Sequence, residues 1–214
     1  MKKLNRHPSN CLVGLVAGQN DWMKEAPKDE IWIELDKMQS GYCAYCECHL
    51  KRKHIEHFKT RAAHPRETFS WGNVFGSCGD SAKAGGWGRC GIYKDADAGK
   101  YNIAELVKPD VDDPNDYFLF LISGIVIARP SLTGSALRKA EETIRVLNLN
   151  EDSVLFNSRR KAILAIQQEI DELYQMQEEL GDLWQSFLDE ALTDVCGQEF
   201  QTALEHSWRY NLSY

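Results

Sequence analysis

The chain has 214 residues, of which 43% are hydrophobic and 27% charged, an ordinary balance for a globular protein that folds in water. This length predicts one domain or two small ones, with a core that needs no disulfides. The net charge of −7 argues against a general nucleic-acid coat. The longest apolar run, residues 117–128, is too short to cross a bilayer, so we expect a cytoplasmic protein without membrane contact.

The charges are unevenly divided along the chain. Residues 1–105 hold 16 basic and 13 acidic side chains, whereas residues 106–214 hold 9 and 19. The stretch 108–115 contains two prolines and three aspartates and is typical of a boundary or long loop. We therefore expect two parts, 1–107 and 108–214, with different partners. The plainer interpretation is that most acidic residues form a solvated helical face.

The first part predicts mixed secondary structure. Residues 29–38 predict a short helix, because apolar side chains recur at helical spacing and acids stand in the first turn. Gly41 ends this helix, and residues 43–48 predict a tight knuckle. Residues 49–58 predict a strand, residues 69–75 a turn or helix start, and the glycine-rich residues 79–88 an exposed loop.

The second part predicts a hairpin followed by helices. Residues 117–122 and 125–128 are apolar and flank Ser123-Gly124, as in a β-hairpin. Ser135 can cap the next helix. Residues 159–195 then predict one long helix with a heptad pattern, which Gly181 interrupts. This helix either packs on the protein's own core or docks on a partner.

The reactive side chains gather in residues 43–91, which hold five of the seven cysteines and four of the six histidines. An odd number of clustered cysteines favours a metal site in a reducing compartment over a disulfide framework. Cys43-x-x-Cys46 brings two thiolates to one ion, and Cys78 with Cys90 supplies a second pair. The pattern predicts a structural Zn²⁺. Cys48 is an alternative ligand, but a Cys-x-Cys spacing is less favourable for binding one ion with both sulfurs. The alternative to a metal site is that these cysteines are buried free thiols.

Between the cysteine pairs lies His54-Ile55-Glu56-His57. On a strand, His54 and Glu56 share one face. A carboxylate can hold Mg²⁺ or Mn²⁺, and a neutral histidine can remove a proton from water that attacks phosphorus. We expect Glu56, with His54, to hold this catalytic cation and His57 to be the general base. Asn73, 16 residues further on, is expected to orient the His57 ring, although an isolated Gly-Asn is more often a turn.

Basic residues surround this motif, and Glu56 is the only acid from 49 to 66. The positive potential of these clustered basic side chains attracts phosphates. The alternative is a solvated basic face without a ligand. The expected nucleic-acid contacts are Lys51, Arg52, Lys53, Lys59 and Arg61.

Together these residues resemble the HNH (ββα-metal) endonucleases. The family pattern is Cys-x-x-Cys, a strand ending in Asp-His, an Asn, and a second Cys pair followed by Lys. Here Glu56-His57 replaces Asp-His, and Lys94 follows Cys90 by four residues. Gly91 stands where many members have His or Asn, so one catalytic-metal ligand is unassigned. The possibilities are His54, Asp80 and Asp95, and His54 is favoured because it shares a strand face with Glu56.

The chain is more similar still to the HNH nuclease subunits of Septu anti-phage systems, which also accompany certain retrons. The similarity covers roughly residues 40–160. It is carried by Cys43-Ala44-Tyr45-Cys46-Glu47, His54-Ile55-Glu56-His57-Phe58, Trp71-Gly72-Asn73, Ser77-Cys78, Cys90-Gly91, Ala140-Glu141-Glu142-Thr143-Ile144, Leu147-Asn148-Leu149-Asn150 and Arg159.

The resemblance implies an α+β fold: a zinc-stabilised ββα-metal nuclease module with a mostly α-helical C-terminal region. It implies an ABC/SMC-like ATPase partner and a nucleic-acid substrate, DNA or RNA. Where the system carries a retron, it also implies a reverse transcriptase with its RNA and DNA as a partner. The rivals are a non-catalytic zinc module that binds nucleic acid or protein, and a toxin-like RNase.

Overall fold

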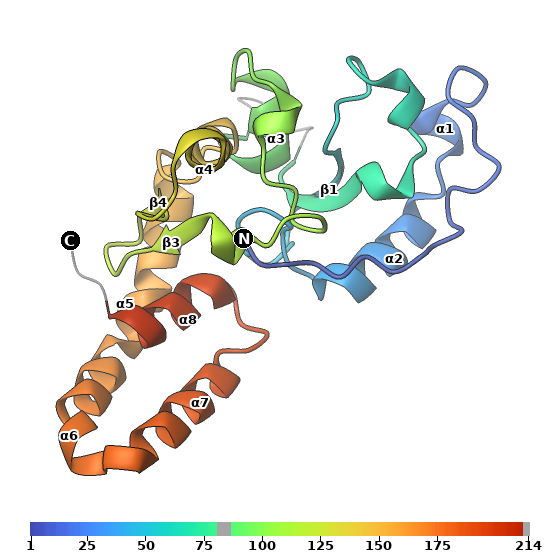
Figure 1. Ribbon diagram of the computed structural model, residues 1–214. Helices are drawn as coiled ribbons and strands as arrows, with labels where there is room; N and C mark the ends of the chain where they lie inside the picture. Colours follow the sequence, from blue (N-terminus) through green and yellow to red (C-terminus); the bar gives the residue numbers. More distant parts are fainter. Residues whose placement is uncertain (81–86, 212–214) are drawn as a thin grey trace.

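The fold is mixed, with two small antiparallel sheets and helices around them (Figure 1). A computed structural model describes residues 1–80 and 87–211. The predicted loop at residues 79–88 falls mostly outside these ranges. The helices are α1 (Trp22–Glu25), α2 (Lys28–Gln39), α3 (Cys90–Ala96), α4 (Gly134–Val146), α5 (Ser153–Gln175), α6 (Gln177–Leu180), α7 (Trp184–Asp194) and α8 (Gln201–Tyr210); the strands are β1 (Lys53–His57), β2 (Val74–Cys78), β3 (Phe118–Phe120) and β4 (Val126–Ala128).

The first sheet forms a ββα unit with α3. β1 pairs antiparallel with β2, with Glu56 opposite Phe75 and His57 opposite Val74. α3 packs against both strands. β1 is shorter than the predicted strand, and residues 71–73 form a single 3-10 turn that leads into β2.

α2 holds this sheet in place. Ile31 and Leu35 are buried at helical spacing, as the pattern predicts. At the end of α2, the Gln39 amide donates to the Gly76 carbonyl and accepts from the Gly76 N–H. A Cβ at Gly76 would lie 2.9 Å from the Trp32 ring. Only glycine therefore lets the helix approach β2 this closely.

The second sheet is the predicted hairpin, β3–β4, and Gly124 in its turn adopts φ 89°. α4 follows as expected, but its N-cap is Thr133, so the predicted capping role of Ser135 is wrong. One hydrophobic core continues across both halves of the chain and includes Leu35, Phe75, Phe118 and Ile163. The division near residue 108 stays a prediction.

The predicted single helix over residues 159–195 is wrong. α5 ends at Gln175, and after the short α6 the backbone of Gly181 takes φ 50° and ψ −121°, which no α-helix allows. α7 then runs back beside α5, and the two form an arm that extends from the rest of the molecule (Figure 1). α8 packs against α5, and the Tyr174 hydroxyl of α5 donates to the Trp208 carbonyl of α8. Because the chain reverses, the buried side chains differ from those of the predicted heptad. Leu188, which is outside the heptad, is buried, whereas Phe187, which is part of it, is 47% exposed.

Candidate metal centre and catalytic cleft

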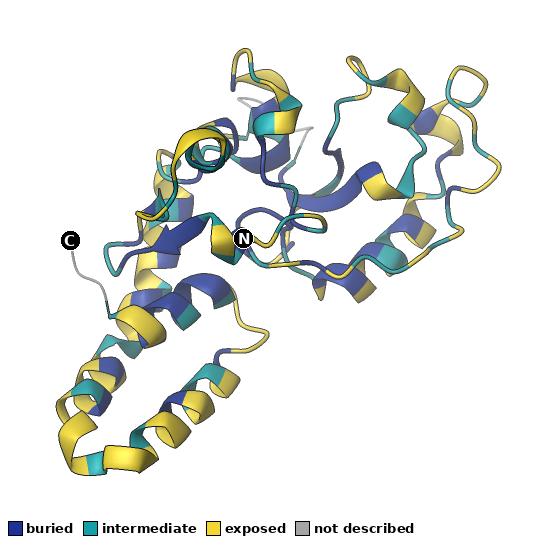
Figure 2. Ribbon diagram, viewed as in Figure 1, coloured by how far each residue is buried: buried dark blue, intermediate teal, exposed yellow. Residues whose placement is uncertain are grey.

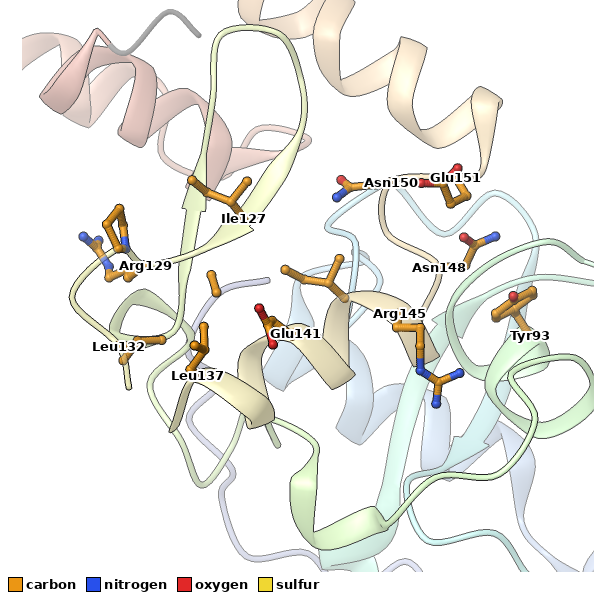
Figure 3. A pocket seen from close by; sticks show the side chains of 13 residues that line it. Tyr93, Ile127, Arg129, Leu132, Leu137, Glu141, Arg145, Asn148, Asn150 and Glu151 are labelled. Atoms are coloured by element: carbon orange, nitrogen blue, oxygen red, sulfur yellow. The ribbon is translucent and has the colours of Figure 1, made fainter. Parts of the chain in front are cut away.

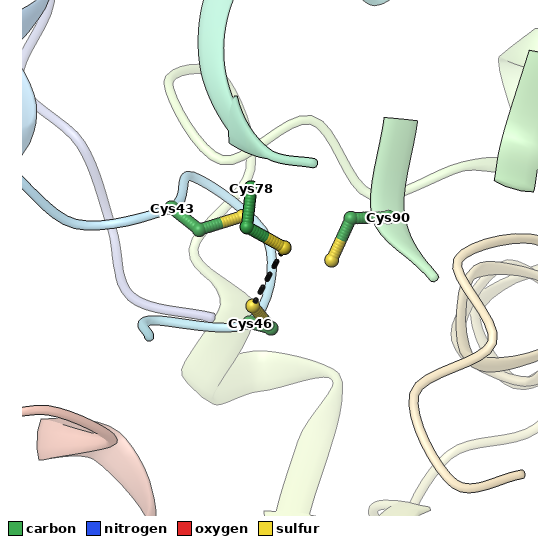
Figure 4. A group of neighbouring side chains, drawn as sticks. All are labelled: Cys43, Cys46, Cys78 and Cys90. Carbon is green, nitrogen blue, oxygen red and sulfur yellow. Dashed lines mark hydrogen bonds between the residues drawn. The ribbon is translucent and has the colours of Figure 1, made fainter. Parts of the chain in front are cut away.

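The four predicted zinc ligands meet at one end of the ββα unit. Cys43 and Cys46 lie in the turn before β1, Cys78 ends β2, and Cys90 begins α3 (Figure 4). Their sulfur atoms all lie within 4.8 Å of one another, and the Sγ atoms of Cys46 and Cys78 are 3.6 Å apart. Sulfurs bound tetrahedrally to Zn²⁺ at about 2.3 Å are about 3.8 Å apart, so the spacing fits this ion.

The electrostatics of the four thiols would favour a bound cation. All four residues are buried. Burial raises the pKa of the Cys46 and Cys90 thiols, whereas hydrogen bonds from the neighbouring thiols hold the pKa of Cys78 well below its usual value. Cys78 is therefore the favoured thiolate, and a divalent cation would also stabilise the thiolate forms of Cys46 and Cys90.

Cys48 is a neighbour of this cluster and not a member of the four-ligand set. Its Sγ lies 3.0 Å from that of Cys46. The group of sulfurs that are mutually within reach of one ion is nevertheless Cys43, Cys46, Cys78 and Cys90, which agrees with the choice made from the sequence.

β1 carries the acid and the histidine, and the Glu56 carboxylate lies against Gly91 at the start of α3. As strand alternation predicts, His54 and Glu56 share a face, with 3.2 Å between His54 Nε2 and Glu56 Oε2. Neighbouring ligands of an octahedral Mg²⁺ are about 3 Å apart. The pair therefore fits a small divalent cation, which His54 and Glu56 would hold from one side.

Lys94 is the other partner of this carboxylate. Its ammonium is fully buried, 3.0 Å from Glu56 Oε1, and it also contacts Asp95 Oδ1 and the His57 carbonyl. Burial by itself raises the pKa of Glu56, but the charge of Lys94 and the hydrogen bond with His54 lower it overall. Glu56 is thus held ionised, and only its Oε2 is turned towards His54.

His57 is oriented by the backbone. Its Nε2 donates to the Thr68 carbonyl at 2.9 Å, which leaves Nδ1 as the unprotonated nitrogen. The Trp22 ring meets the imidazole edge-on, with 4.3 Å between ring centroids. Burial lowers the pKa of His57 to about 4, with Arg61 acting in the same direction, so the ring is neutral at pH 7.

The predicted contact between Asn73 and the His57 ring is wrong. The Asn73 amide donates to the carbonyls of Lys59 and Glu67, and its oxygen accepts from the Lys59 N–H. Asn73 thereby holds the loop that follows β1. Since Thr68 lies just beyond Glu67 in that loop, Asn73 acts on His57 only through the backbone.

His54, Glu56 and His57 line a cleft of about 500 Å³. The sequence missed one wall of this cleft, which α1 and α2 supply through Trp22, Met23, Lys28 and Trp32. No local signal marks these residues, because they reach the site only through tertiary packing. Asp95 also lines the cleft, and burial with the nearby Glu56 charge raises its pKa to about 6.

The predicted basic contacts divide into two groups. Lys53 and Arg61 line the cleft, where Lys53 lies over the Trp32 ring and Arg61 over the Trp22 ring. Lys59 pairs with Glu67 on the neighbouring loop. Lys51 and Arg52 are exposed just before the first strand and do not line the cleft.

A cavity of about 620 Å³ lies away from this site, between β4, α4 and the segment that follows α4 (Figure 3). Its lining is mainly apolar, with Arg129 at one end and Glu151 at the other (Figure 3). It brings together no group of potential metal ligands and no residue of the His-x-Glu-His motif. The cleft at His57 is therefore the stronger candidate for a functional site, although it is the smaller of the two.

Neither a protein-family model nor a curated protein matches this chain. The geometry of the two centres therefore carries the functional argument. Among the described residues, no helix has both the length and the apolar composition needed to cross a membrane.

Proposed function

We propose that this protein is a metal-dependent HNH endonuclease that hydrolyses phosphodiester bonds. The observation that carries the proposal is the placement of His57. It ends β1 inside a cleft, with a free Nδ1, beside a carboxylate and histidine spaced for a divalent cation, and the same ββα unit holds four clustered thiols. Such a site can activate water against a phosphate.

The protein's own residues would act as follows. His57 Nδ1 accepts a proton from the attacking water, and the Thr68 carbonyl stabilises the imidazolium through Nε2. Lys28, Lys53 and Arg61, at the rim, hold phosphate oxygens. A divalent cation at His54 and Glu56, Mg²⁺ or Mn²⁺, would supply positive charge for the phosphate and the leaving oxygen. Zinc at the four cysteines would be structural, because the four sulfurs would supply all the ligands that a tetrahedral ion takes.

We further propose that the nuclease is the effector subunit of an anti-phage complex with an ABC/SMC-like ATPase, of the Septu or retron-associated kind, in the cytoplasm. The sequence resemblance supports this part of the proposal. A retron reverse transcriptase with its RNA and DNA would join in systems that carry one. The acidic C-terminal half would contact the ATPase and add no catalytic group.

The experiment compares wild type with His57→Ala on DNA and on RNA, with Mg²⁺ or Mn²⁺. His49→Ala, an exposed histidine outside the cleft, is the matched control. We expect His57→Ala to lose cleavage by at least a hundredfold with unchanged zinc content and circular dichroism. Equal cleavage by both variants would contradict the proposal.

The rivals correspond to other outcomes of that experiment. A non-catalytic zinc module would bind nucleic acid equally well with and without His57 and cleave neither substrate. A toxin-like RNase would cleave RNA alone. The site does not choose between DNA and RNA, because the acting groups address the phosphate that both share.

A further inference from the structure

The arm formed by residues 162–196, here called the acidic arm, extends away from the core (Figure 1). It contains most of α5, all of α6 and α7, and the turn at Gly181. Its outer surface is largely exposed (Figure 2). The structure therefore leaves a long helical surface without a covering element from the described part of the chain.

The charged side chains of this arm are all acidic. It holds nine of the 32 acidic residues of the chain and none of the 25 basic ones. All nine are exposed, and none forms an ion pair among the described residues. They are Glu169, Asp171, Glu172, Glu178, Glu179, Asp182, Asp189, Glu190 and Asp194. Crowded like charges destabilise an isolated helix pair, so the arrangement suits an opposite charge outside the chain.

α7 and Leu183, which precedes it, together present two apolar faces, where a surface helix needs only one. Leu188 and Val195 are buried, and α7 packs against both α5 and α8. On the other side Leu183 is 62% and Phe187 47% exposed. These two are four residues apart, and Glu190 and Asp194 continue the same stripe at helical spacing. The outer stripe is thus apolar near the tip and acidic towards the base.

We propose that this outer stripe docks on a partner protein that offers an apolar pocket bordered by lysine and arginine side chains. Leu183 and Phe187 fill the pocket, while Glu190 and Asp194 meet the basic border. Charge complementarity selects this occupant. Nucleic acid and anionic membranes would be repelled by the nine carboxylates, and so would the arm of a second copy.

The inference rests on the proposed complex in one respect: the partner used as the probe is the ATPase subunit. The measurement is the Kd between the purified full-length chain and that ATPase. The test variants are Leu183→Ser with Phe187→Ser, and Glu190→Lys with Asp194→Lys. The control is Val13→Ser with Val111→Ser, since these valines are 75% and 67% exposed elsewhere. Circular dichroism and nucleic-acid cleavage without ATPase establish that each variant is folded.

We expect each test variant to weaken binding at least tenfold and the control to leave it unchanged. Binding of the wild type should also weaken as salt rises from 50 to 300 mM, as screening of the carboxylates requires. Unchanged binding of either arm variant would overturn the inference while the complex itself stands. Light scattering that shows a dimer dissociated by Leu183→Ser with Phe187→Ser would make the occupant a second copy and also overturn it.

A wild-type chain that does not bind the ATPase would overturn both this inference and the complex. The nuclease activity is decided separately by the His57→Ala comparison, so the two failures are distinguishable.

Discussion

The carboxylate of Glu56 occupies the space that a side chain at position 91 would need. A Cβ built on Gly91 would overlap Glu56 Oε2 and Cδ. Glutamate, one methylene longer than the aspartate usual in the resembled family, thus reaches across to the start of α3. The longer side chain of Glu56 therefore fits in this position only because residue 91 is a glycine.

This relationship predicts the effect of Gly91→Ala. The new methyl group would push the Glu56 carboxylate away from His54, and displacement of a reacting group by about 1 Å can cost about a hundredfold in rate. We expect cleavage to fall by at least tenfold with zinc retained. Gly72→Ala is the control, because its Cβ would meet nothing closer than 3.8 Å. A Gly91→Ala variant with wild-type cleavage would show that the carboxylate position is unimportant.

Removal of one zinc ligand should unfold the first sheet. Cys78→Ser leaves three buried thiols that cannot hold the ion well, and structural zinc contributes directly to folding free energy. We expect zinc content, measured by elemental analysis, to fall from one ion per chain to almost none, with loss of cooperative thermal unfolding. Cys196→Ser, at an exposed cysteine, should change neither. Full zinc binding by Cys78→Ser would refute the four-sulfur site.

Lys94→Met tests the buried ion pair. Loss of the ammonium would leave the Glu56 carboxylate buried without its countercharge, which costs about 3–5 kcal/mol in comparable cases. Urea unfolding measures the effect, and the exposed Lys100→Met is the control. Adding Glu56→Gln to Lys94→Met should restore part of the stability, because a neutral amide then replaces the buried Glu56 carboxylate. A double variant that is less stable than Lys94→Met would contradict this account.

His206 predicts a pH dependence of stability. Its Nδ1 accepts from the Phe120 N–H and its Nε2 faces the Asn115 side-chain oxygen, so the folded ring is neutral. Burial, with the Arg129 charge, lowers its pKa to about 3 while Glu47 opposes this. A depressed histidine pKa gives stability that is present above about pH 6.5 and lost as the pH falls towards 3.

When the pH is lowered from 7 to 5, protonation of His206 should reduce the free energy of unfolding by about 2 kcal/mol. In His206→Gln, whose side chain can still accept from the Phe120 N–H, the decrease over this range should be smaller by that amount. Urea unfolding at the two pH values measures both. Identical decreases in wild type and variant would mean that His206 is not the titrating group.

The local features of the sequence predicted the local structure well. The helix at residues 28–39, the β3–β4 hairpin, the Cys43–Cys46 turn and the shared face of His54 and Glu56 all follow from spacing alone. Helical and strand periodicities depend on neighbouring residues, and a Cys-x-x-Cys turn fixes its own two sulfurs. These features need no knowledge of distant contacts.

Tertiary structure decided what surrounds them. Trp22 and Trp32 form the cleft wall, Thr68 in place of Asn73 orients His57, and Lys94 neutralises Glu56. The heptad pattern at residues 159–195 fits one long helix as well as two antiparallel helices. The packing of α7 against α5 decided for the second arrangement, with the chain reversing at Gly181. Each of these outcomes depends on burial between segments far apart in the chain, and no local periodicity records which segments meet.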